Sequence, residues 1–440
     1  MSADTELFSN SPSGIGDFKI LITAHDGELF DISDNVTELS MFESIYRPYI
    51  HGNIVVVDNS MMLADIPMVG QERVLIQWKR DDQLTTKVFF ANRVANVSKQ
   101  NDGVGVFEIS INSVIQTRNA VSLFSQSYEG LSDEIIQLIF ADQLGAGVIP
   151  MDGTVGKTKH SVVFPYMKPL QAVDMIIKNV LADDNTPMFV YETLYPNEIR
   201  LDSLGRMAER ESIVRISGKT PVNDDSEGQA SRKSLKERGN VYDESISRAY
   251  DLFDNLNKGS FASNIIITDP STRQYEVVEF NYKEDAPPLF QNWISPDFVD
   301  AEGMRPEEQF NTRNTYLPRN ELAFNEKPPN LNTIDDKDRT ILNSYIRRHA
   351  ITVVKVYMDS IAYTLETDEP FTVGQTVDYD LLKSMPRLPG SYEEMDKFNS
   401  GKYIISAIRH YIKNYEYNMS VELIRDGIGE EASFVREESR

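Results

Sequence analysis

Short runs of alternating apolar and polar residues dominate the first hundred positions of the chain. Such period-two alternation is typical of β-strands with one buried and one exposed face. It predicts strands at Phe18–Ala24, Asn53–Asp58, Arg73–Trp78, Thr86–Val94 and Val104–Ile111. Glycines in the turns His25–Gly27 and Asn101–Gly103 supply the positive φ that hairpins need. Five or more short strands in this stretch predict a small antiparallel barrel or sandwich.

Helical spacing then interrupts the strands twice. Ser132 can cap a helix that ends near Gly145, and Pro169 suits the first turn of a second helix. Their inward positions are Ile135, Ile136, Leu138 and Ile139, then Leu170, Val173, Ile176, Ile177, Val180 and Leu181. With strands expected around Met188–Tyr191 and Glu198–Asp202, these helices predict a small α+β unit over about 120–211.

The second half of the chain begins with a change in composition. Residues Gly218–Gly239 are rich in Asp, Ser, Lys, Arg and Gly, which indicates a loop or linker. A β-rich piece at Ser263–Phe280, an irregular Pro-rich segment at Pro287–Pro329 and a helix at Ile334–His349 follow. The remaining predicted strands are Ile351–Met358, Ile361–Thr367, Phe371–Tyr379, Lys402–His410 and Tyr411–Ile424.

These patterns predict a mainly β fold with α+β insertions, in which two similar antiparallel β-barrels are joined by α/β and irregular domains. We expect an N-terminal arm at 1–14, a first barrel at 15–118 and an α+β domain at 119–211. A linker with the first strand region of the second barrel is expected at 212–240, and a β-rich, irregular insertion at 241–332. The helix and second barrel occupy 333–428, and a charged tail 429–440.

An internal repetition supports the expectation of two barrels. Val69-Gly70-Gln71 precedes a strand, a lysine-led strand at Lys87–Phe90 and a closing strand at Val106–Ile109. The same order recurs as Val373-Gly374-Gln375, Lys402–Ile405 and Val421–Ile424, with extra residues in the polar loop 383–401. A duplication would leave this pattern, and a chance recurrence of short β patterns would also produce it.

Composition and charge exclude several classes of protein. The chain of 440 residues has 44 Lys plus Arg, 68 Asp plus Glu and no Cys, and its formal charge is −24. The absence of thiols excludes disulfides, thiolate metal sites and cysteine nucleophiles, and the negative charge disfavours binding to a phosphate backbone. No stretch approaches the roughly 18 apolar residues of a membrane span. The polar residues 1–12 do not have the pattern of a secretory signal, so we expect a soluble protein.

Two motifs resemble ligand-binding loops without completing them. Gly153–Thr158 ends like a phosphate-binding loop, but Met151 stands where the first glycine should be, and His160–Phe164 predicts a strand instead of the required helix. We interpret this segment as a flexible turn. Asn223–Gly228 begins like a calcium-binding loop, but the twelfth position is Ser234 instead of Glu. We interpret it as a solvated loop.

No catalytic, cofactor-binding or metal-binding residues are predicted. The histidines are scattered and are interpreted as hydrogen-bonded structural residues; they are His25, His51, His160, His349 and His410. No Gly-x-Ser-x-Gly elbow occurs. Glu72, Glu108 and Asp378 lie in alternating strands and are interpreted as outward-facing. No carboxylate has the apolar context that announces a raised pKa, so an enzyme and a cofactor are not expected.

Four runs of the sequence resemble the baseplate hub proteins of contractile-tailed bacteriophages, the ring proteins that join the central spike to the tail tube. Two are Phe42–Asp58 (FESIYRPYIHGNIVVVD) and Leu63–Glu72 (LADIPMVGQE). Two more, which resemble the second barrel of these proteins, are Ser400–His410 (SGKYIISAIRH) and Val421–Asp426 (VELIRD). Together with the helix-to-strand join at His349–Val356 they mark a resemblance that extends over about half the chain, and the middle, 218–329, matches nothing in the family.

The resemblance implies a homotrimeric ring in which two barrels per chain give pseudo-sixfold symmetry and DNA passes through the centre. Its partners would be the trimeric spike protein, the tail tube or tube-initiator protein, wedge proteins and the tape measure protein, in the virion baseplate and, during assembly, in the host cytoplasm. Neither specific nucleic-acid binding nor membrane anchoring is implied. Because such a ring must not bind the DNA, acidic side chains should outnumber basic ones on its lumen.

Other classes stay open at this point. A two-barrel protein of another kind would share these framework patterns, and a tail-associated cell-wall-degrading or receptor-binding protein would share the location. The aromatic residues of the Pro-rich segment favour receptor binding if they are exposed, although we interpret them as interface or core. They are Phe290, Trp293, Phe298, Phe310 and Tyr316.

Overall fold

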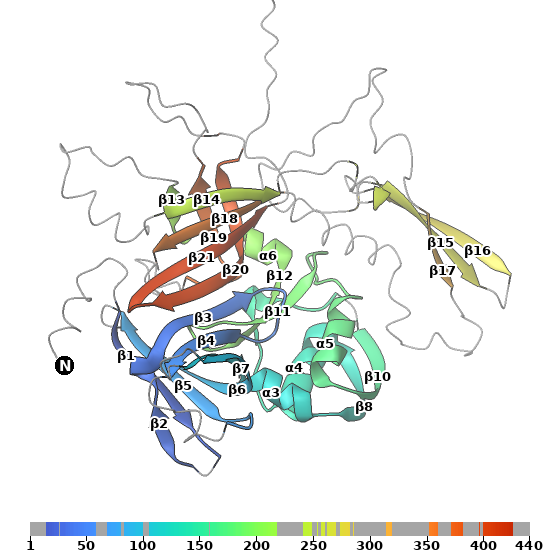
Figure 1. The fold of residues 1–440 in the computed structure, drawn as a ribbon. Coiled ribbons are helices and arrows are strands. Elements are labelled where there is room, and N and C mark those ends of the chain that lie inside the picture. Colours follow the sequence, from blue (N-terminus) through green and yellow to red (C-terminus); the bar gives the residue numbers. More distant parts are fainter. Residues whose placement is uncertain are drawn as a thin grey trace, which may run out of the picture.

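The computed structural model of the chain is mainly β, as predicted, and its largest element is a 13-stranded sheet. The structure describes residues 15–25, 27–58, 68–80, 83–99, 105–157, 159–217, 241–248, 253, 257–259, 262–269, 273–281, 285, 314–318, 352–359, 371–381, 396 and 399–425. The predictions for Gly218–Gly239, Asn223–Gly228, Ile334–His349 and Ile361–Thr367 lie outside these residues. In Figure 1 the sheet fills the left of the molecule, and the helices gather beside its lower half.

One half of the sheet is built from the first hundred residues. Its core strands in spatial order are β3 (Val36–Ser44), β4 (His51–Asp58), β7 (Gly105–Ser113), β6 (Gln83–Lys99) and β5 (Arg73–Arg80). β1 (Gly16–Thr23) and β2 (Leu29–Asp31) extend it, and the 3₁₀ turn η1 (Ser33–Asn35) links β2 to β3. Alternation decides which face is buried: in β4 every second residue, beginning with Gly52, is buried.

The other half of the sheet comes from the second part of the chain. Its strands in spatial order are β14 (Val241–Arg248), β18 (Thr352–Asp359), β21 (Glu416–Arg425), β20 (Gly401–Lys413) and β19 (Thr376–Asp380), with β13 (Arg215–Ser217) beside β19. β14 lies within the segment predicted as an insertion, so the strand that opens this half was placed wrongly. Its sequence, VYDESISR, is too polar to predict a strand of the main sheet.

The two halves are a repeat, because their strands pair in the same order and share two β-bulges at equivalent places. β3, β4, β7, β6 and β5 correspond to β14, β18, β21, β20 and β19. One bulge follows Ala91, which is opposite Ile111, and one follows Ile405, which is opposite Leu423. A second bulge separates Val36 from Glu38 in β3, and Val241 from Asp243 in β14. Bulges are designed features of a strand pair, so their recurrence favours duplication over chance.

The predicted alignment of the two copies is wrong by one residue at its glycines. The N–H of Gly374 donates to Ile405 O (2.9 Å), and in the first copy the N–H of Gln71 donates to Ala91 O (2.8 Å). Gly374 therefore corresponds to Gln71, and both have positive φ values of 82° and 77°. Gly70, with φ of 94°, lies one residue earlier. Sequence letters alone could not show this, because the left-handed position is a glycine in one copy and a glutamine in the other.

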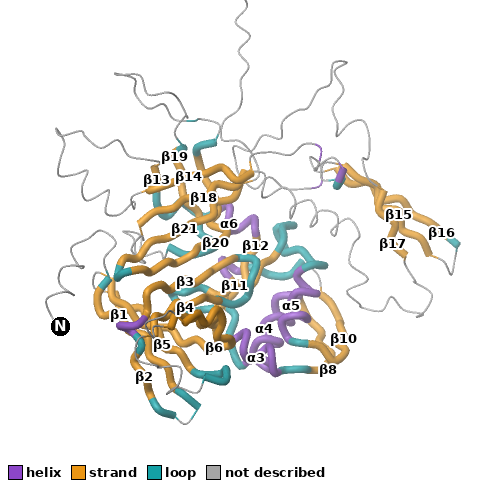
Figure 2. The backbone as a smooth tube through the Cα atoms, in the orientation of Figure 1, coloured by secondary structure: helices purple, strands orange, loops and turns teal. Residues whose placement is uncertain are grey.

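The α+β unit packs beside the first repeat around a second apolar cluster (Figure 2). It contains α3 (Val114–Val121), β8 (Phe124–Leu131), α4 (Ser132–Ile139), the π-helical turn η2 (Phe140–Leu144), β9 (Ile149–Pro150), η3 (Met151–Gly153), β10 (Lys159–Met167), α5 (Pro169–Ile177), β11 (Met188–Glu192), β12 (Ile199–Ser203) and α6 (Leu204–Glu209). Gly145 closes the α4–η2 helix in the left-handed conformation, as predicted. Ser132 is the first helical residue and not the cap; the Glu134 carboxylate instead accepts the Leu131 N–H at 2.8 Å.

A separate three-stranded sheet lies to the right in Figure 1. Its central strand β15 (Ala262–Asp269) pairs with β16 (Gln274–Asn281) and, in parallel, with β17 (Asn314–Pro318). The β-rich piece predicted at Ser263–Phe280 is thus a hairpin, and the Pro-rich segment contributes β17. Among the helices within the described ranges, none is long and apolar enough to cross a membrane.

Candidate functional site

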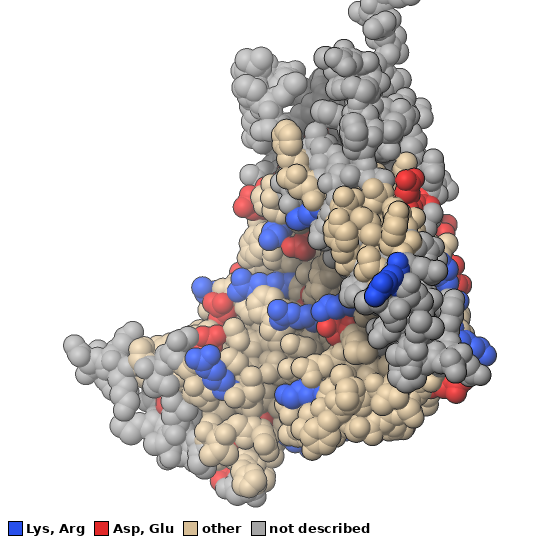
Figure 3. Space-filling view, turned by 90° about the vertical axis from the view of Figure 1, so that its right-hand side faces the viewer, with Lys and Arg blue, Asp and Glu red and all other residues tan. Residues whose placement is uncertain are grey.

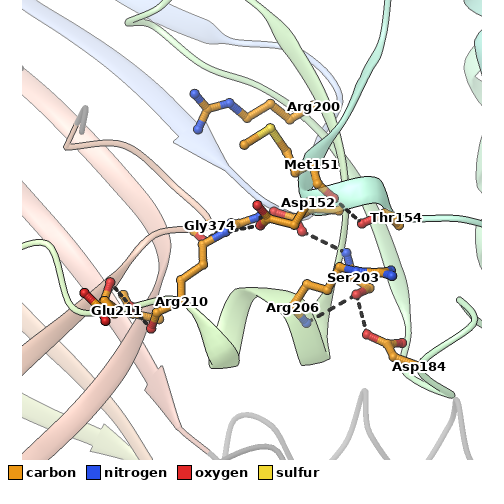
Figure 4. Close-up of polar contacts among 12 residues, drawn as sticks. Met151, Asp152, Thr154, Asp184, Arg200, Ser203, Arg206, Arg210, Glu211 and Gly374 are labelled. Carbon is orange, nitrogen blue, oxygen red and sulfur yellow. Dashed lines mark hydrogen bonds and ion pairs between the residues drawn. The ribbon is translucent and has the colours of Figure 1, made fainter. Parts of the chain in front are cut away.

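Three buried polar clusters connect the α+β unit to the two repeats, and we call them together the polar junction. The first surrounds Arg210, which directly follows α6 and points toward the second repeat (Figure 4). Its Nη1 donates to Gly374 O at 2.8 Å and lies 2.7 Å from Asp202 Oδ2, while its Nε donates to Asp152 Oδ2 at 2.7 Å. Tyr191 donates its hydroxyl to the same Asp202 oxygen at 2.9 Å. One guanidinium therefore links β12, η3 and the turn before β19.

Local structure holds Arg210 in place. Ser203 caps α6 by accepting the Arg206 N–H at 3.3 Å, and its hydroxyl donates to Asp184 Oδ2 at 2.5 Å (Figure 4). Arg206 also forms a fork with Asp183, with distances of 2.7 and 3.0 Å. Because α6 is fixed at its first turn, the arginine that follows its last turn has a defined direction.

Burial controls the electrostatics around Arg210. Burial raises the pKa of Tyr191 well above its ordinary value, and the nearby charge of Asp202 raises it further. Burial acts to lower the pKa of Arg210, but the charge of Asp202 outweighs it and the net pKa is raised. Tyr191 therefore stays protonated and Arg210 stays charged at any ordinary pH. Burial also raises the pKa of Asp202, although the charge of Arg210 and the hydrogen bonds from Arg210 and Tyr191 act to lower it.

The second cluster surrounds Glu43, a fully buried residue of β3. Its Oε1 accepts the Leu194 N–H at 2.7 Å and lies 3.2 Å from His410 Nε2. Its Oε2 accepts the Thr372 hydroxyl at 2.7 Å. Burial acts to raise the pKa of Glu43, but the hydrogen bond and charge of His410 and the other donors outweigh it, so the net pKa is lowered. This carboxylate joins both repeats and the α+β unit.

The third cluster is the buried pair of Lys87 and Glu192. Lys87 Nζ lies 3.0 Å from Glu192 Oε1 and donates to Thr193 O at 3.1 Å, and both side chains are nearly inaccessible to solvent, at 2% and 7%. Glu192 Oε2 accepts the Ile50 N–H at 2.8 Å. The end of β11 is thereby attached to β6 and to the residue before β4. Buried charges of this kind are costly unless paired.

The chemistry of the polar junction is that of a structural connection. Glu43, Lys87, Glu192 and Asp202 are buried, Arg210 is largely buried and Asp152 is half exposed, and each of them contacts a side chain or backbone group of another element. In the part of the chain that the structure describes, no group of three or more His, Asp or Glu residues could hold a metal ion. The arrangement fixes the relative orientation of the three units.

The phosphate-loop-like segment leads into a strand instead of a helix, as the sequence predicts, but its described part is a packed turn and not the flexible turn that was expected. Gly153 ends η3, and the segment leads into β10. The Gly156 N–H donates to Asp133 Oδ1 at 2.7 Å, and a Cβ on Gly156 would lie 2.7 Å from Ser132 N. The turn is thus packed against α4, and its backbone N–H is used within the protein.

The histidines and strand carboxylates have different outcomes. His410 is a buried structural residue, as predicted, whose Nδ1 lies 2.6 Å from the Tyr417 hydroxyl. His25 is exposed, and His349 lies outside the described residues. Glu108 and Asp378 are half-buried. The interpretation of Glu72 as outward-facing is wrong, because Glu72 is buried and accepts the Val69 and Gly70 N–H groups at 2.7 and 3.1 Å.

Sequence reasoning missed the residues of the polar junction. Leu194 and Thr372, which donate to Glu43, lie 151 and 329 positions away from it along the chain. No local spacing rule connects residues this far apart. A weak signal was present in β3, whose buried positions include Ser40 and Glu43. A charged residue where alternation calls for an apolar one indicates a buried partner.

Charges are mixed on the face shown in Figure 3. Lys and Arg side chains form a band across the middle of this face, and Asp and Glu side chains lie between and around them. Much of the remaining described surface is neither basic nor acidic.

The fold is found in tail proteins of phage type. The chain is similar in structure to the 43 kDa tail protein of prophage MuSo2 from Shewanella oneidensis, with a TM-score of 0.53, 9% identity, and coverage of 94% of this chain and 100% of that one. It is also similar to the tail protein from Neisseria meningitidis MC58, with a TM-score of 0.51, 10% identity, and coverage of 94% and 97%. No family model and no curated protein matches the sequence.

Proposed function

We propose that the chain is a structural baseplate hub protein of a phage-type tail, which forms a homotrimeric ring. The observation that carries this proposal is the five-strand repeat, whose copies share their strand order and two of their bulges within one sheet. Three chains with two alike units each would present six alike units around one axis. Such a ring suits a sixfold tube on one side and a threefold spike on the other.

The polar junction supports this role. A ring that transmits force between spike and tube must keep its units in fixed orientation, and the three buried clusters do so within each chain. The proposed partners are a second and third copy of the chain, the trimeric spike, the tube or tube-initiator protein, wedge proteins and the tape measure protein. DNA would pass through the ring without specific binding. The protein would reside in the virion baseplate, would assemble in the host cytoplasm and would catalyse no reaction.

Native mass spectrometry of the purified full chain, alone and with the spike protein from the same genome, tests the proposal. We expect trimers, and rings with threefold symmetry in electron micrographs. Dimers or tetramers in the intact particle would contradict it. A zymogram on peptidoglycan tests the absence of catalysis, and a lytic band abolished by one carboxylate substitution would contradict that part.

The acidic lumen remains a prediction of this proposal. A density map of the ring would show which charged side chains lie near its axis. We expect more Asp and Glu than Lys and Arg there, because like charge keeps DNA in transit from binding. A basic lumen would show that the acidic balance serves solubility instead.

Receptor binding is the second candidate function, and the three-stranded sheet favours it. Tyr275 is opposite Thr268 and Tyr316 is opposite Ile266, so both tyrosines project from the same face. They are 75% and 66% exposed, and Val277 beside them is 46% exposed. An exposed aromatic face can bind a sugar or a protein. If it does, changing both tyrosines to serine would abolish adsorption to host cells while leaving particle assembly intact.

A further inference from the structure

The contact between the two repeats is a strand pair. Residues 407–413 of β20 pair antiparallel with residues 38–44 of β3, and this pair makes the sheet continuous. Side chains reinforce it: Arg409 Nη2 donates to Ser40 Oγ at 2.9 Å, and the Tyr411 hydroxyl donates to Glu38 at 3.0 Å. The Arg409 guanidinium lies 4.7 Å from the centre of the Tyr411 ring. One repeat thus docks on the next through β-strand addition.

The repeat identifies the counterparts of these two strands. β14 corresponds to β3, and the second part of β6 corresponds to the second part of β20. In the described part of the sheet, β14 is the terminal strand and pairs with β18. β6 pairs with β5 over 83–90, and over 93–99 its described strand pairing is with β7. Both counterparts therefore lie at edges of the sheet as far as the structure describes it.

We infer that β14 of one subunit pairs with residues 95–99 of β6 of the next subunit, which repeats between chains the contact that β3 and β20 make within one chain. The inference rests on the proposed ring and names the surfaces that close it. A sheet edge presents a row of N–H and C=O groups that is ready to pair with another strand. A second copy is the fitting partner, because this chain already contains the matching strand.

The register of this pair follows from the strands on either side. Val106 of β7 and Asn418 of β21 are equivalent, because each lies five residues before the residue opposite the shared bulge. Ser98 is opposite Val106 and Tyr411 is opposite Asn418, so Ser98 takes the place of Tyr411. Asn53 of β4 and Lys355 of β18 are equivalent positions in the two copies. Ser40 is opposite Asn53 and Ser245 is opposite Lys355, so Ser245 takes the place of Ser40. Tyr411 and Ser40 are directly opposite each other. Ser98 of one subunit should therefore lie opposite Ser245 of its neighbour.

A second position gives the same register independently. Ala95 takes the place of Arg409, and Arg248 takes the place of Phe42. Arg409 and Phe42 are opposite each other in the pair of β20 and β3. Between the two positions, β6 and β14 each contain an additional bulge that the corresponding strands β20 and β3 lack. Each bulge displaces its strand by one residue, and the two displacements cancel. The pair from Ala95 opposite Arg248 to Ser98 opposite Ser245 is therefore regular.

The exposed surface of β14 agrees with a partner at this edge. Ile246 is 41% exposed and Tyr242 is 46% exposed, although both lie on a strand of the main sheet. Ser98 and Ser245 are exposed as well. The contact joins two different edges, so it is heterologous, and three copies related by a threefold axis would close it into a ring.

Cysteine cross-linking tests the inference, and the chain has no cysteine of its own. Directly opposite residues in an antiparallel pair have Cα atoms about 4.5–5.5 Å apart, within the range of a disulfide. In the full chain, S98C/S245C treated with copper-phenanthroline should therefore form covalent trimers on non-reducing gels. A mixture of the two single variants should give cross-linked dimers that contain one chain of each kind.

S98C/S247C is the matched control, because its cysteines would be diagonal neighbours about 7–8 Å apart and beyond easy bridging. We expect at least tenfold less cross-linking than for S98C/S245C. Native mass spectrometry of the same samples separates the outcomes. If the protein is a trimer but S98C/S245C cross-links no better than S98C/S247C, the proposed strand pair is wrong and the ring itself is unaffected. A chain that stays monomeric and uncross-linked, alone and with the spike, would overturn both.

Discussion

Glu43 Oε1 lies 3.2 Å from His410 Nε2, with both side chains at most 1% exposed, at the place where the first repeat meets the second. Glu43 belongs to β3 and His410 to β20, the two strands that make the sheet continuous. The same carboxylate also accepts the Leu194 N–H from the α+β unit. A single buried carboxylate therefore contacts three parts of the chain. Its removal should affect all of them together.

Glu43→Gln should lower the free energy of unfolding by about 2–3 kcal/mol, the usual worth of hydrogen bonds to a buried charged acceptor. The amide keeps the size of the side chain but has one acceptor oxygen where the carboxylate has two. Urea denaturation followed by circular dichroism measures the loss. Glu38→Gln is the control, because Glu38 is partly exposed, and it should change the stability by less than about 1 kcal/mol. Equal losses in the two variants would contradict a special role of Glu43.

The stabilising effect of Glu43 should disappear in acid. Its pKa in the folded protein is lowered below the ordinary value of 4.5. A carboxyl with a lowered folded pKa stabilises the fold above its unfolded pKa, and this contribution is lost as the pH falls through the folded pKa. The stability difference between the wild type and Glu43→Gln should therefore be constant from pH 7 to 5 and shrink below pH 4.5. Urea titrations between pH 7 and 3.5 measure it, and a difference that grows in acid would refute the sign.

Much of the fold could be predicted from the sequence where alternation is clean. The expected strands at Asn53–Asp58 and Arg73–Trp78 are β4 and β5, within two residues at each end. β3 was missed because Ser40 and Glu43 occupy buried positions in it. β14 was missed because its sequence, VYDESISR, is mostly polar and has no clear alternation of apolar and polar residues.

The polar junction could not be predicted, because its members come from segments far apart in the chain. Arg210 lies 164 positions from Gly374, and Lys87 lies 106 positions from Thr193. In sequence each is an ordinary surface-type residue. Their burial is decided by how the α+β unit docks on the repeats, which is a tertiary property. The internal repeat was visible in the sequence, but its correct alignment needed the hydrogen bonds.

Arg210→Lys should destabilise the protein by about 3 kcal/mol or more, because a lysine cannot reach Gly374 O, Asp202 and Asp152 together. Asp202 is fully buried and would lose its main partner. Arg215→Lys is a matched control, since Arg215 forms a fork with Asp380 at an exposed site. It should cost less than about 1 kcal/mol. Hydrogen exchange should also become faster in β11 and β12 of Arg210→Lys only. Unchanged exchange there would contradict the role of Arg210 in holding these strands.

Gly374→Ala should be far more harmful than Gly70→Ala, although both glycines have positive φ values, of 82° and 94°. The left-handed conformation itself costs an alanine roughly 1–2 kcal/mol at either site. At Gly70 nothing lies within 4 Å of the added Cβ. At Gly374 the added Cβ would overlap the Tyr191 hydroxyl and lie 2.7 Å from the ring carbon that carries it.

Tyr191 cannot move aside, because it is fully buried and donates its hydroxyl to Asp202. Forcing a methyl group into such a packed site adds roughly 1–3 kcal/mol of strain, so Gly374→Ala should lose about 2–5 kcal/mol in total. Urea midpoints of the two variants and the wild type decide the matter. The near-ultraviolet circular dichroism of buried tyrosines should change in Gly374→Ala alone. Equal destabilisation by the two alanines would show that backbone strain dominates and that the close approach of Tyr191 to the turn before β19 has no energetic weight.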